Sequence, residues 1–158
     1  MNTRAGQHAG FSLIELMITV AIVALLAAIA VPNYRNHVID TSRVAAAADV
    51  QELALFLERA FSAQGRFDDS TSVGNLVNAL PYTTSPQSGS DTAKYNIAVT
   101  SLSATSYTLT ATPSGPQADD TECGALTLDE SGVQCILNGT TCSSSSTASV
   151  RDTVAACW

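Results

Sequence analysis

The chain has 158 residues, which is enough for one domain with a small core. It carries 14 acidic and 7 basic residues, and only Glu15 and Arg4 among them lie in the first 31 positions, so the remainder has thirteen acidic and six basic residues. A general nucleic-acid surface needs clustered basic side chains. The charge balance therefore excludes that class of surface, and we expect no specific nucleic-acid partner.

A long apolar run extends from Phe11 to Val31, with Glu15 as its only charged residue. A helix of this length spans about 30 Å, the thickness of one bilayer hydrocarbon core. An ordinary membrane anchor explains the length but not the glutamate, because a carboxylate at the centre of a bilayer helix costs about 2.5–3.5 kcal/mol. A secretory signal peptide cleaved after Ala30 is the other alternative, but a carboxylate inside its apolar region is atypical.

The residues around this run carry a specific motif. The preceding segment, MNTRAGQHAG, is short, polar and slightly basic; GFSLIELM begins at its last glycine, and Pro32-Asn33-Tyr34 follows the run. In these features the chain resembles the type IV pilin family, with its prepilin-type leader, and within it the PilE-like minor pilins. The resemblance covers about residues 1–35. It implies an α+β fold in which a long N-terminal helix, half of it transmembrane, packs on a small antiparallel sheet with a disulfide-bonded C-terminal region.

The same resemblance implies processing of the amino terminus. A prepilin peptidase and methyltransferase would remove residues 1–10 by cleavage after Gly10 and would methylate Phe11. Residues 11–31 would then form the membrane and filament-core helix, and residues 32–158 the globular domain. The new α-amino group lies four positions before Glu15. We expect Glu15 of one subunit to neutralise the Phe11 amine of its neighbour in a filament, with an i,i+4 pair within one chain as the alternative.

The helical pattern continues beyond the apolar run. Pro32 lacks an N–H group and predicts a kink, although the resemblance implies one long helix. Apolar residues at helical spacing then predict a face that contacts a sheet: Val50, Leu53, Leu57, Ala60 and Phe61. Gly65 is the expected end of the helix.

Strands are predicted in the second half of the chain. Residues 66–93 form a turn-rich connection in which the apolar residues between Val73 and Leu80 indicate one short helix. Residues 95–100 and 107–111 alternate between apolar and polar side chains, as expected for strands, and Leu126 and Leu128 belong to a third strand followed by a turn at 129–132. Residues 143–146 are a run of serines expected to be flexible.

The four cysteines are expected to form disulfides, since an even number in a chain that crosses a membrane indicates an oxidising compartment. Asn138-Gly139 is a strong signal for a two-residue hairpin, and such a turn places Cys135 opposite Cys142 at a separation that a disulfide accepts. By elimination, Cys123 pairs with Cys157. The resemblance implies that this C-terminal region forms much of the exposed variable surface.

No residue pattern indicates catalysis, a cofactor or a metal. A catalytic triad would have to use His37 at the edge of the bilayer, so we expect no catalytic residue and no enzyme activity. Asp119, Asp120 and Glu122 could in principle hold calcium, but their spacing does not match an ordered ligand set, which favours a solvated acidic loop.

Together these features predict a structural subunit of a type IV pilus, a minor pilin supporting pilus biogenesis, adhesion, twitching motility or DNA uptake. A pseudopilin of a type II secretion system and a DNA-receptor pilin are the alternatives, followed by a plain secreted binding domain. Expected partners are the prepilin peptidase, other pilin subunits, and the inner membrane with its assembly platform. The chain would cross the inner membrane once with a periplasmic globular domain, and would reach the extracellular pilus after assembly.

Overall fold

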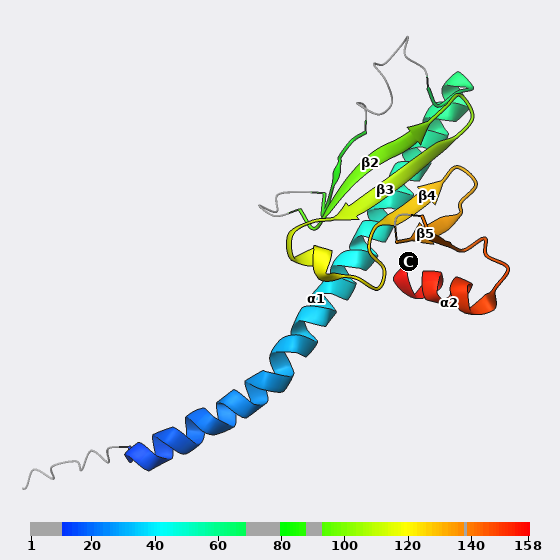
Figure 1. Ribbon diagram of the computed structural model, residues 1–158. Coiled ribbons are helices and arrows are strands. Elements are labelled where there is room, and N and C mark those ends of the chain that lie inside the picture. The colour runs from blue at the N-terminus through cyan, green and yellow to red at the C-terminus, as the bar shows by residue number, and fades with distance from the viewer. Residues whose placement is uncertain (1–10, 69–79, 88–92, 138) are drawn as a thin grey trace, which may run out of the picture. The chain divides into compact units, whose positions relative to one another are not determined.

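The computed structural model describes residues 11–68, 80–87, 93–137 and 139–158. The predicted leader (residues 1–10) and most of the predicted short helix (residues 73–80) lie outside these ranges. The chain divides into two compact units, Met1–Val38 and Ile39–Trp158. The described part combines one long helix, α1, with an antiparallel sheet and a short C-terminal helix, α2, and it is therefore an α+β fold (Figure 1).

Helix α1 extends from Leu13 to Gln64 and is continuous through Pro32. Alanine and leucine, which favour helices, occur in both halves of α1, although the first half also contains many β-branched residues. The chain leaves the helix at Gly65, as predicted: Gly65 has a φ of 75° and its N–H donates to the Phe61 carbonyl at 2.6 Å. A left-handed glycine of this kind satisfies a carbonyl that the helix itself leaves free.

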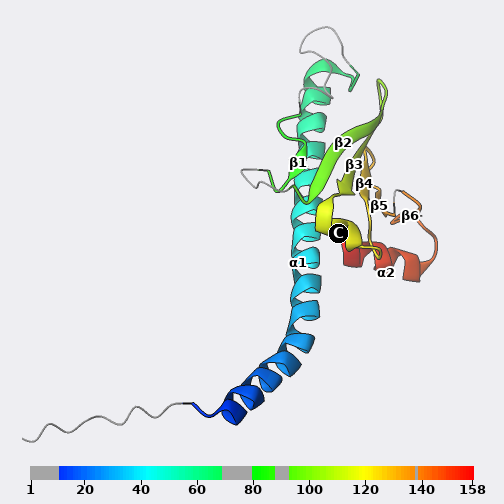
Figure 2. The same cartoon turned by 60° about the vertical axis from the view of Figure 1, so that its left-hand side comes forward.

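The sheet lies in the second unit and has six strands in the order β1-β2-β3-β4-β5-β6, each antiparallel to the next (Figure 2). The bounds are β1 Thr84–Ser85, β2 Tyr95–Leu102, β3 Tyr107–Pro113, β4 Leu126–Asp129, β5 Gln134–Ile136 and β6 Thr141–Cys142. The three strands expected from alternation are confirmed. The sequence did not predict β1, which has only two residues.

Two further elements were not predicted, one between β3 and β4 and one after β6. A 3₁₀ turn, η1, covers Gly115–Asp119, and α2 covers Ala148–Cys157. Val150, Val154 and Cys157 fall at helical spacing on α2, and Val154 and Cys157 are buried. This i, i+4, i+7 pattern is the signal that could have predicted α2. The pattern is short and follows a run of serines, so it was not recognised as a helix.

The core lies between the second half of α1 and one face of the sheet. Val50, Leu53 and Leu57 have no exposed surface, and Ala60 and Phe61 pack against them in partly buried positions, so the predicted helical face is confirmed. The sheet contributes alternate residues, as period-2 strands require: Tyr95, Ile97, Tyr107, Leu109, Ala111, Leu126 and Ile136. Phe67 joins this core through ring contacts with Phe61 and Tyr107.

Candidate functional site: an exposed apolar helix and a disulfide-bonded C-terminal region

The described part of the first unit is almost entirely helical, and its surface is uncovered. Every described residue from Phe11 to Val38 is exposed. Thirteen large apolar residues from Phe11 to Val31 are more than half exposed, including Leu25 at 71% and Ile29 at 67%. Among the described helices, α1 alone is long and apolar enough to cross a membrane. A surface of this kind favours a bilayer or another apolar surface over water.

Glu15 lies in the first turn of α1 and is exposed. A carboxylate is favourable there because the partial positive charge of the helix dipole is concentrated in the first turn. Phe11 precedes the helix and is 79% exposed. Gly10 lies outside the described residues, so cleavage after Gly10, methylation of Phe11 and pairing of Glu15 remain predictions.

The cysteines of the second unit form two nested disulfides. Cys123 is bonded to Cys157 across 34 positions, and Cys135 to Cys142 across 7. These are the pairs expected from the hairpin and from elimination. The register that places Cys135 opposite Cys142 and Ile136 opposite Thr141 is also as expected. Asn138 lies outside the described residues.

The loop of this hairpin contains a residue whose conformation the sequence did not predict. Leu137 has a φ of 51°, in the left-handed region, and it is 38% exposed. Its N–H donates to the Cys123 carbonyl at 2.9 Å, and its carbonyl accepts from the Thr140 N–H at 3.3 Å. The first bond holds the hairpin loop against the segment that carries the outer disulfide, and the second lies within the loop.

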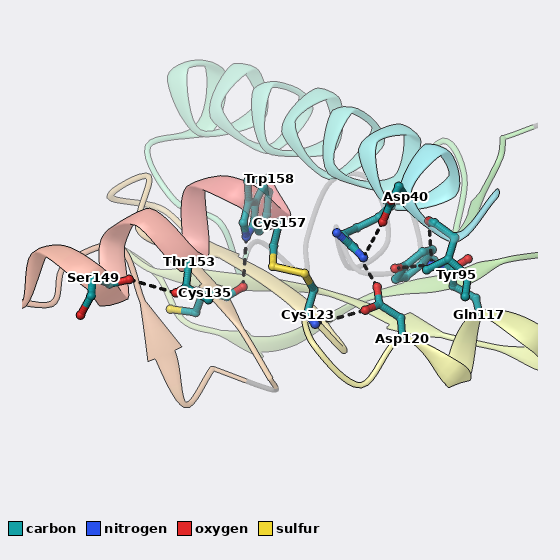
Figure 3. Close-up of a disulfide and its surroundings, with 12 residues drawn as sticks. Asp40, Tyr95, Gln117, Asp120, Cys123, Cys135, Ser149, Thr153, Cys157 and Trp158 are labelled. Carbon is teal, nitrogen blue, oxygen red and sulfur yellow. Dashed lines mark hydrogen bonds and ion pairs between the residues drawn. A yellow bond between two sulfur atoms is a disulfide. The ribbon is translucent and has the colours of Figure 1, made fainter. Parts of the chain in front are cut away.

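A buried polar cluster joins this region to α1 (Figure 3). The Arg43 Nε donates to Asp120 Oδ2 at 2.8 Å, and its Nη2 donates to Asp40 Oδ1 at 3.1 Å. The side chain of Arg43 is 10% exposed and that of Asp120 is 2% exposed, whereas that of Asp40 is 62% exposed. The pair formed by Arg43 and Asp120 is therefore the buried part of the cluster.

Gln117, on η1, forms the second connection to the helix. Its side-chain amide donates to the Ile39 carbonyl at 3.1 Å and to the Tyr95 hydroxyl at 3.0 Å. Gln117 is 1% exposed and Tyr95 has no exposed surface. A buried amide and a buried phenol need such partners, because an unsatisfied buried polar group costs about 1–3 kcal/mol.

Two groups of this cluster, Arg43 and Tyr95, have pKa values that are raised from their ordinary values. Burial by itself would lower the pKa of the Arg43 guanidinium, but its hydrogen bond to Asp120 and the charge of that carboxylate outweigh burial, so the pKa is raised. Burial raises the pKa of the Tyr95 phenol, while the hydrogen bond from Gln117 opposes that effect. Neither group is poised for proton transfer near neutral pH, and the cluster is accordingly structural.

The expectation of a solvated acidic loop was wrong for one of its three residues. Asp119 and Glu122 are exposed, as expected, but Asp120 is buried. Its partner, Arg43, lies 77 positions earlier in the sequence, and local spacing contains no information about so distant a contact. Within the described ranges, no three His, Cys, Asp or Glu side chains are grouped so that they could hold a metal ion.

The outer face of the sheet has a shallow depression of about 310 Å³ lined by Thr100, Thr108, Thr110, Thr127 and Gly139. The Thr100 and Thr110 hydroxyl oxygens lie 2.8 Å apart. The residues that line the depression carry no charge, so it is not a site for a strongly charged ligand.

Basic side chains of the second unit are dispersed. Arg43 is buried, Arg66 lies 2.6 Å from Asp68, and Arg151 donates to the Ser145 and Ser146 carbonyls. Arg59 lies on α1 and Lys94 precedes β2. The described residues therefore present no basic stripe of the kind that follows a phosphate backbone.

Comparisons with known proteins match both the N-terminal helix and the part of the chain that follows it. The family model described as "Type IV minor pilin ComP, DNA uptake sequence receptor" matches residues 32–127, more than half of the chain. The model for the prokaryotic N-terminal methylation motif matches residues 6–31.

Curated relatives match over part of their length. A probable minor fimbrial protein of Dichelobacter nodosus is 41% identical over 69 residues, which is 44% of this chain and 40% of that protein. A fimbrial protein of Pseudomonas aeruginosa is 47% identical over 51 residues, which is 32% of this chain and 33% of that protein. The matches thus span 40% or less of these two relatives.

Among solved structures, the non-core minor pilin PilV of Neisseria meningitidis has a TM-score of 0.46 at 19% identity, covering 71% of this chain and 93% of that chain. A type IV pilin of Shewanella oneidensis has a TM-score of 0.44 at 25% identity, covering 66% and 96%. The match of the family model over residues 32–127 carries the assignment. The chain belongs to the ComP family of type IV minor pilins.

Proposed function

We propose that this chain is a structural subunit, a minor pilin, of a type IV pilus, and that it is not an enzyme. The observation that carries the proposal is the apolar surface of residues 11–31, which no described part of the chain buries. At about 25 cal/mol per Å² of apolar surface, leaving such a helix in water is strongly unfavourable. A bilayer would cover it before assembly, and neighbouring subunits would cover it in a filament.

Processing and location follow from this role. The prepilin peptidase and methyltransferase would cleave after Gly10 and methylate Phe11, leaving residues 11–31 as the membrane and filament-core helix and residues 32–158 as the globular domain. That domain would be periplasmic while the helix spans the inner membrane and contacts the assembly platform. After polymerisation with other pilin subunits it would lie in the extracellular pilus.

Mass spectrometry of the protein purified from its membrane tests the processing step. We expect a chain of 148 residues that begins with methylated Phe11, since ten of the 158 residues are removed. A chain that begins at Val31 would establish signal-peptide cleavage and would contradict the pilin role.

A second experiment separates a pilus from a secretion pseudopilus. Sheared surface filaments are analysed for this chain, and secretion of exoproteins is measured in a deletion strain. A pilus subunit is found in the filaments and its loss leaves secretion intact. Absence from the filaments together with a secretion defect would instead identify a type II pseudopilin.

A second candidate function is that of a DNA receptor, favoured by the description of the matching family. The acidic composition and dispersed basic residues argue against electrostatic, sequence-independent binding. If the chain binds DNA, we therefore expect discrimination between sequences and a shallow salt dependence, because few phosphates would be neutralised.

Binding of the full chain in detergent to duplexes of varied sequence, over a range of salt concentrations, tests this. Equal binding to all duplexes with a steep salt slope would contradict the expected mode, and no binding at low salt would exclude the receptor role.

A further inference from the structure

The buried cluster around Arg43 and the outer disulfide meet at one short segment, residues 117–124. Asp120 uses both carboxylate oxygens: Oδ2 accepts from Arg43 Nε at 2.8 Å, and Oδ1 accepts from the Cys123 N–H at 3.2 Å. The Asp120 carbonyl also accepts from the Gly124 N–H at 3.1 Å. One carboxylate thus links the helix to the cysteine of the outer disulfide (Figure 3).

Cys123 is held from its other side by the C-terminal part of the chain. Its sulfur is bonded to Cys157 at the end of α2, and its carbonyl accepts from the Leu137 N–H. Cys123 and Cys157 are 1% and 2% exposed. The position of the Cys123 backbone, and therefore that of the group that fixes Asp120 Oδ1, depends on α2 remaining docked.

The buried guanidinium of Arg43 needs Asp120 as its counter-ion. Its other ion-pair partner, Asp40, has a largely exposed side chain, so water screens that interaction. A buried guanidinium without a counter-ion is costly, because the desolvation of the charge is then uncompensated. Closure of the disulfide, which restrains residues 117–124, and neutralisation of Arg43 should therefore favour each other.

We propose that the disulfide between Cys123 and Cys157 is an oxidation-dependent clamp on α1: its formation fixes Asp120 against Arg43 and Gln117 against the Ile39 carbonyl. In the oxidised subunit, α1 is then anchored at Ile39 and Arg43, where the second unit begins. In the reduced subunit the counter-ion of a buried arginine is no longer held in place.

The oxidation is a thiol–disulfide exchange with a protein disulfide oxidant. A Cys157 or Cys123 thiolate attacks the oxidant's disulfide, and the resulting mixed disulfide is resolved by the second cysteine. The two thiols of the pilin become one disulfide, while the oxidant's disulfide becomes two thiols. Two electrons pass from the pilin to the oxidant.

Linkage makes the proposal measurable. If disulfide closure strengthens the contact between Arg43 and Asp120, that contact must stabilise the disulfide by the same factor. The full chain in detergent is equilibrated in dithiothreitol redox buffers, free thiols are alkylated, and mass spectrometry gives the oxidised fraction of each cysteine pair. We expect Arg43→Met and Asp120→Asn each to lower the equilibrium constant for forming the outer disulfide by roughly tenfold.

The inner disulfide and an exposed ion pair serve as matched controls. The equilibrium constant for forming the disulfide between Cys135 and Cys142 should stay within about twofold of wild type in both variants. In the described part of the chain neither cysteine forms a hydrogen bond with Arg43, Asp120 or Gln117, so the coupling should be weak. Arg66→Met, which removes the exposed pair with Asp68, should change neither disulfide. An unchanged outer disulfide would overturn the proposal. An equal weakening of both disulfides would also overturn it, because it would indicate general unfolding rather than selective coupling.

A reciprocal measurement uses cysteine variants of the full chain. Hydrogen exchange of the backbone amides in residues 39–47 should be at least about tenfold faster in the double variant C123A/C157A, and unchanged in C135A/C142A. Slow exchange in both variants would contradict the clamp. Acceleration by the same factor over β2, β3 and residues 39–47 would show only a general loss of stability and would likewise contradict it.

Discussion

The two halves of α1 have the same backbone structure and opposite burial. From Leu13 to Val38 all side chains are exposed, although most are apolar. From Ile39 to Gln64 one face is buried, and Val50, Leu53 and Leu57 have no exposed surface. A helix forms its backbone hydrogen bonds locally, so both halves can be helical. Removal of apolar surface from water needs a partner, which the sheet provides only for the second half.

This difference shows which forces should stabilise each half. The second half depends on contacts within the chain, so its disruption should change the free energy of unfolding. The first half makes few such contacts, and under the proposed function its side chains should affect insertion and assembly instead.

The largest effect on folding is expected from the outer disulfide. Replacing Cys123 and Cys157 by alanine should lower the free energy of unfolding of the second unit by about 4 kcal/mol, because the bond closes a long loop. The same replacement of Cys135 and Cys142 should cost only about 2.5 kcal/mol, since that loop is short. Chemical denaturation of the full chain in detergent, followed by tryptophan fluorescence, measures both. A larger loss from the inner pair would contradict the chain-entropy argument.

A cavity in the buried face of α1 should have the next largest effect. Leu53→Ala should lower the free energy of unfolding by about 3 kcal/mol, within the usual range for a fully buried leucine. Leu55, two positions along, is 58% exposed, and Leu55→Ala should change it by less than about 0.5 kcal/mol. The same denaturation experiment compares them, and equal losses would show that the outer face of this half is also buried in solution.

In the first half, Glu15→Ala should affect assembly rather than folding. The neighbour's Phe11 amine would lose its partner in an apolar setting, so we expect entry into filaments to fall on the order of a hundredfold. Membrane insertion should persist, because removal of the charge makes the helix more apolar. Quantitative blotting of sheared filaments against the membrane fraction measures this, with Thr19→Ala as a control. Equal entry of Glu15→Ala and wild type would refute the pairing.

The smallest effect is expected from the exposed ion pair near the end of α1. The side chains of Arg66 and Asp68 are 51% and 32% exposed, so Asp68→Asn should cost less than about 1 kcal/mol. Asp120→Asn removes a charge from a buried pair and should cost more, because it leaves the buried guanidinium of Arg43 without its counter-ion. Thermal unfolding of both variants at low and high salt makes the comparison. Similar losses would mean that burial does not decide the strength of these pairs.

The sequence by itself determined the elements whose signals are local. The apolar run and the leucine spacing predict α1, Gly65 predicts its end, and alternation predicts β2 and β3. The hairpin signal at Asn138-Gly139 predicts the register of Cys135 and Cys142, and the pairing of Cys123 with Cys157 then follows. Except for the pairing of Cys123 with Cys157, which follows by elimination, these features depend on neighbours within a few positions, where backbone geometry restricts the possible contacts.

Only the tertiary structure determined the cluster that joins α1 to the C-terminal region. Asp120 was expected to be solvated, and neither Gln117 nor Arg43 had a pattern to distinguish it. Their partners lie 77 and 78 positions away. A carboxylate in a polar loop has the same local sequence whether water or a guanidinium solvates it. The difference depends on which distant residue the fold places opposite, and that is decided when the sheet packs on the helix and the cysteines pair.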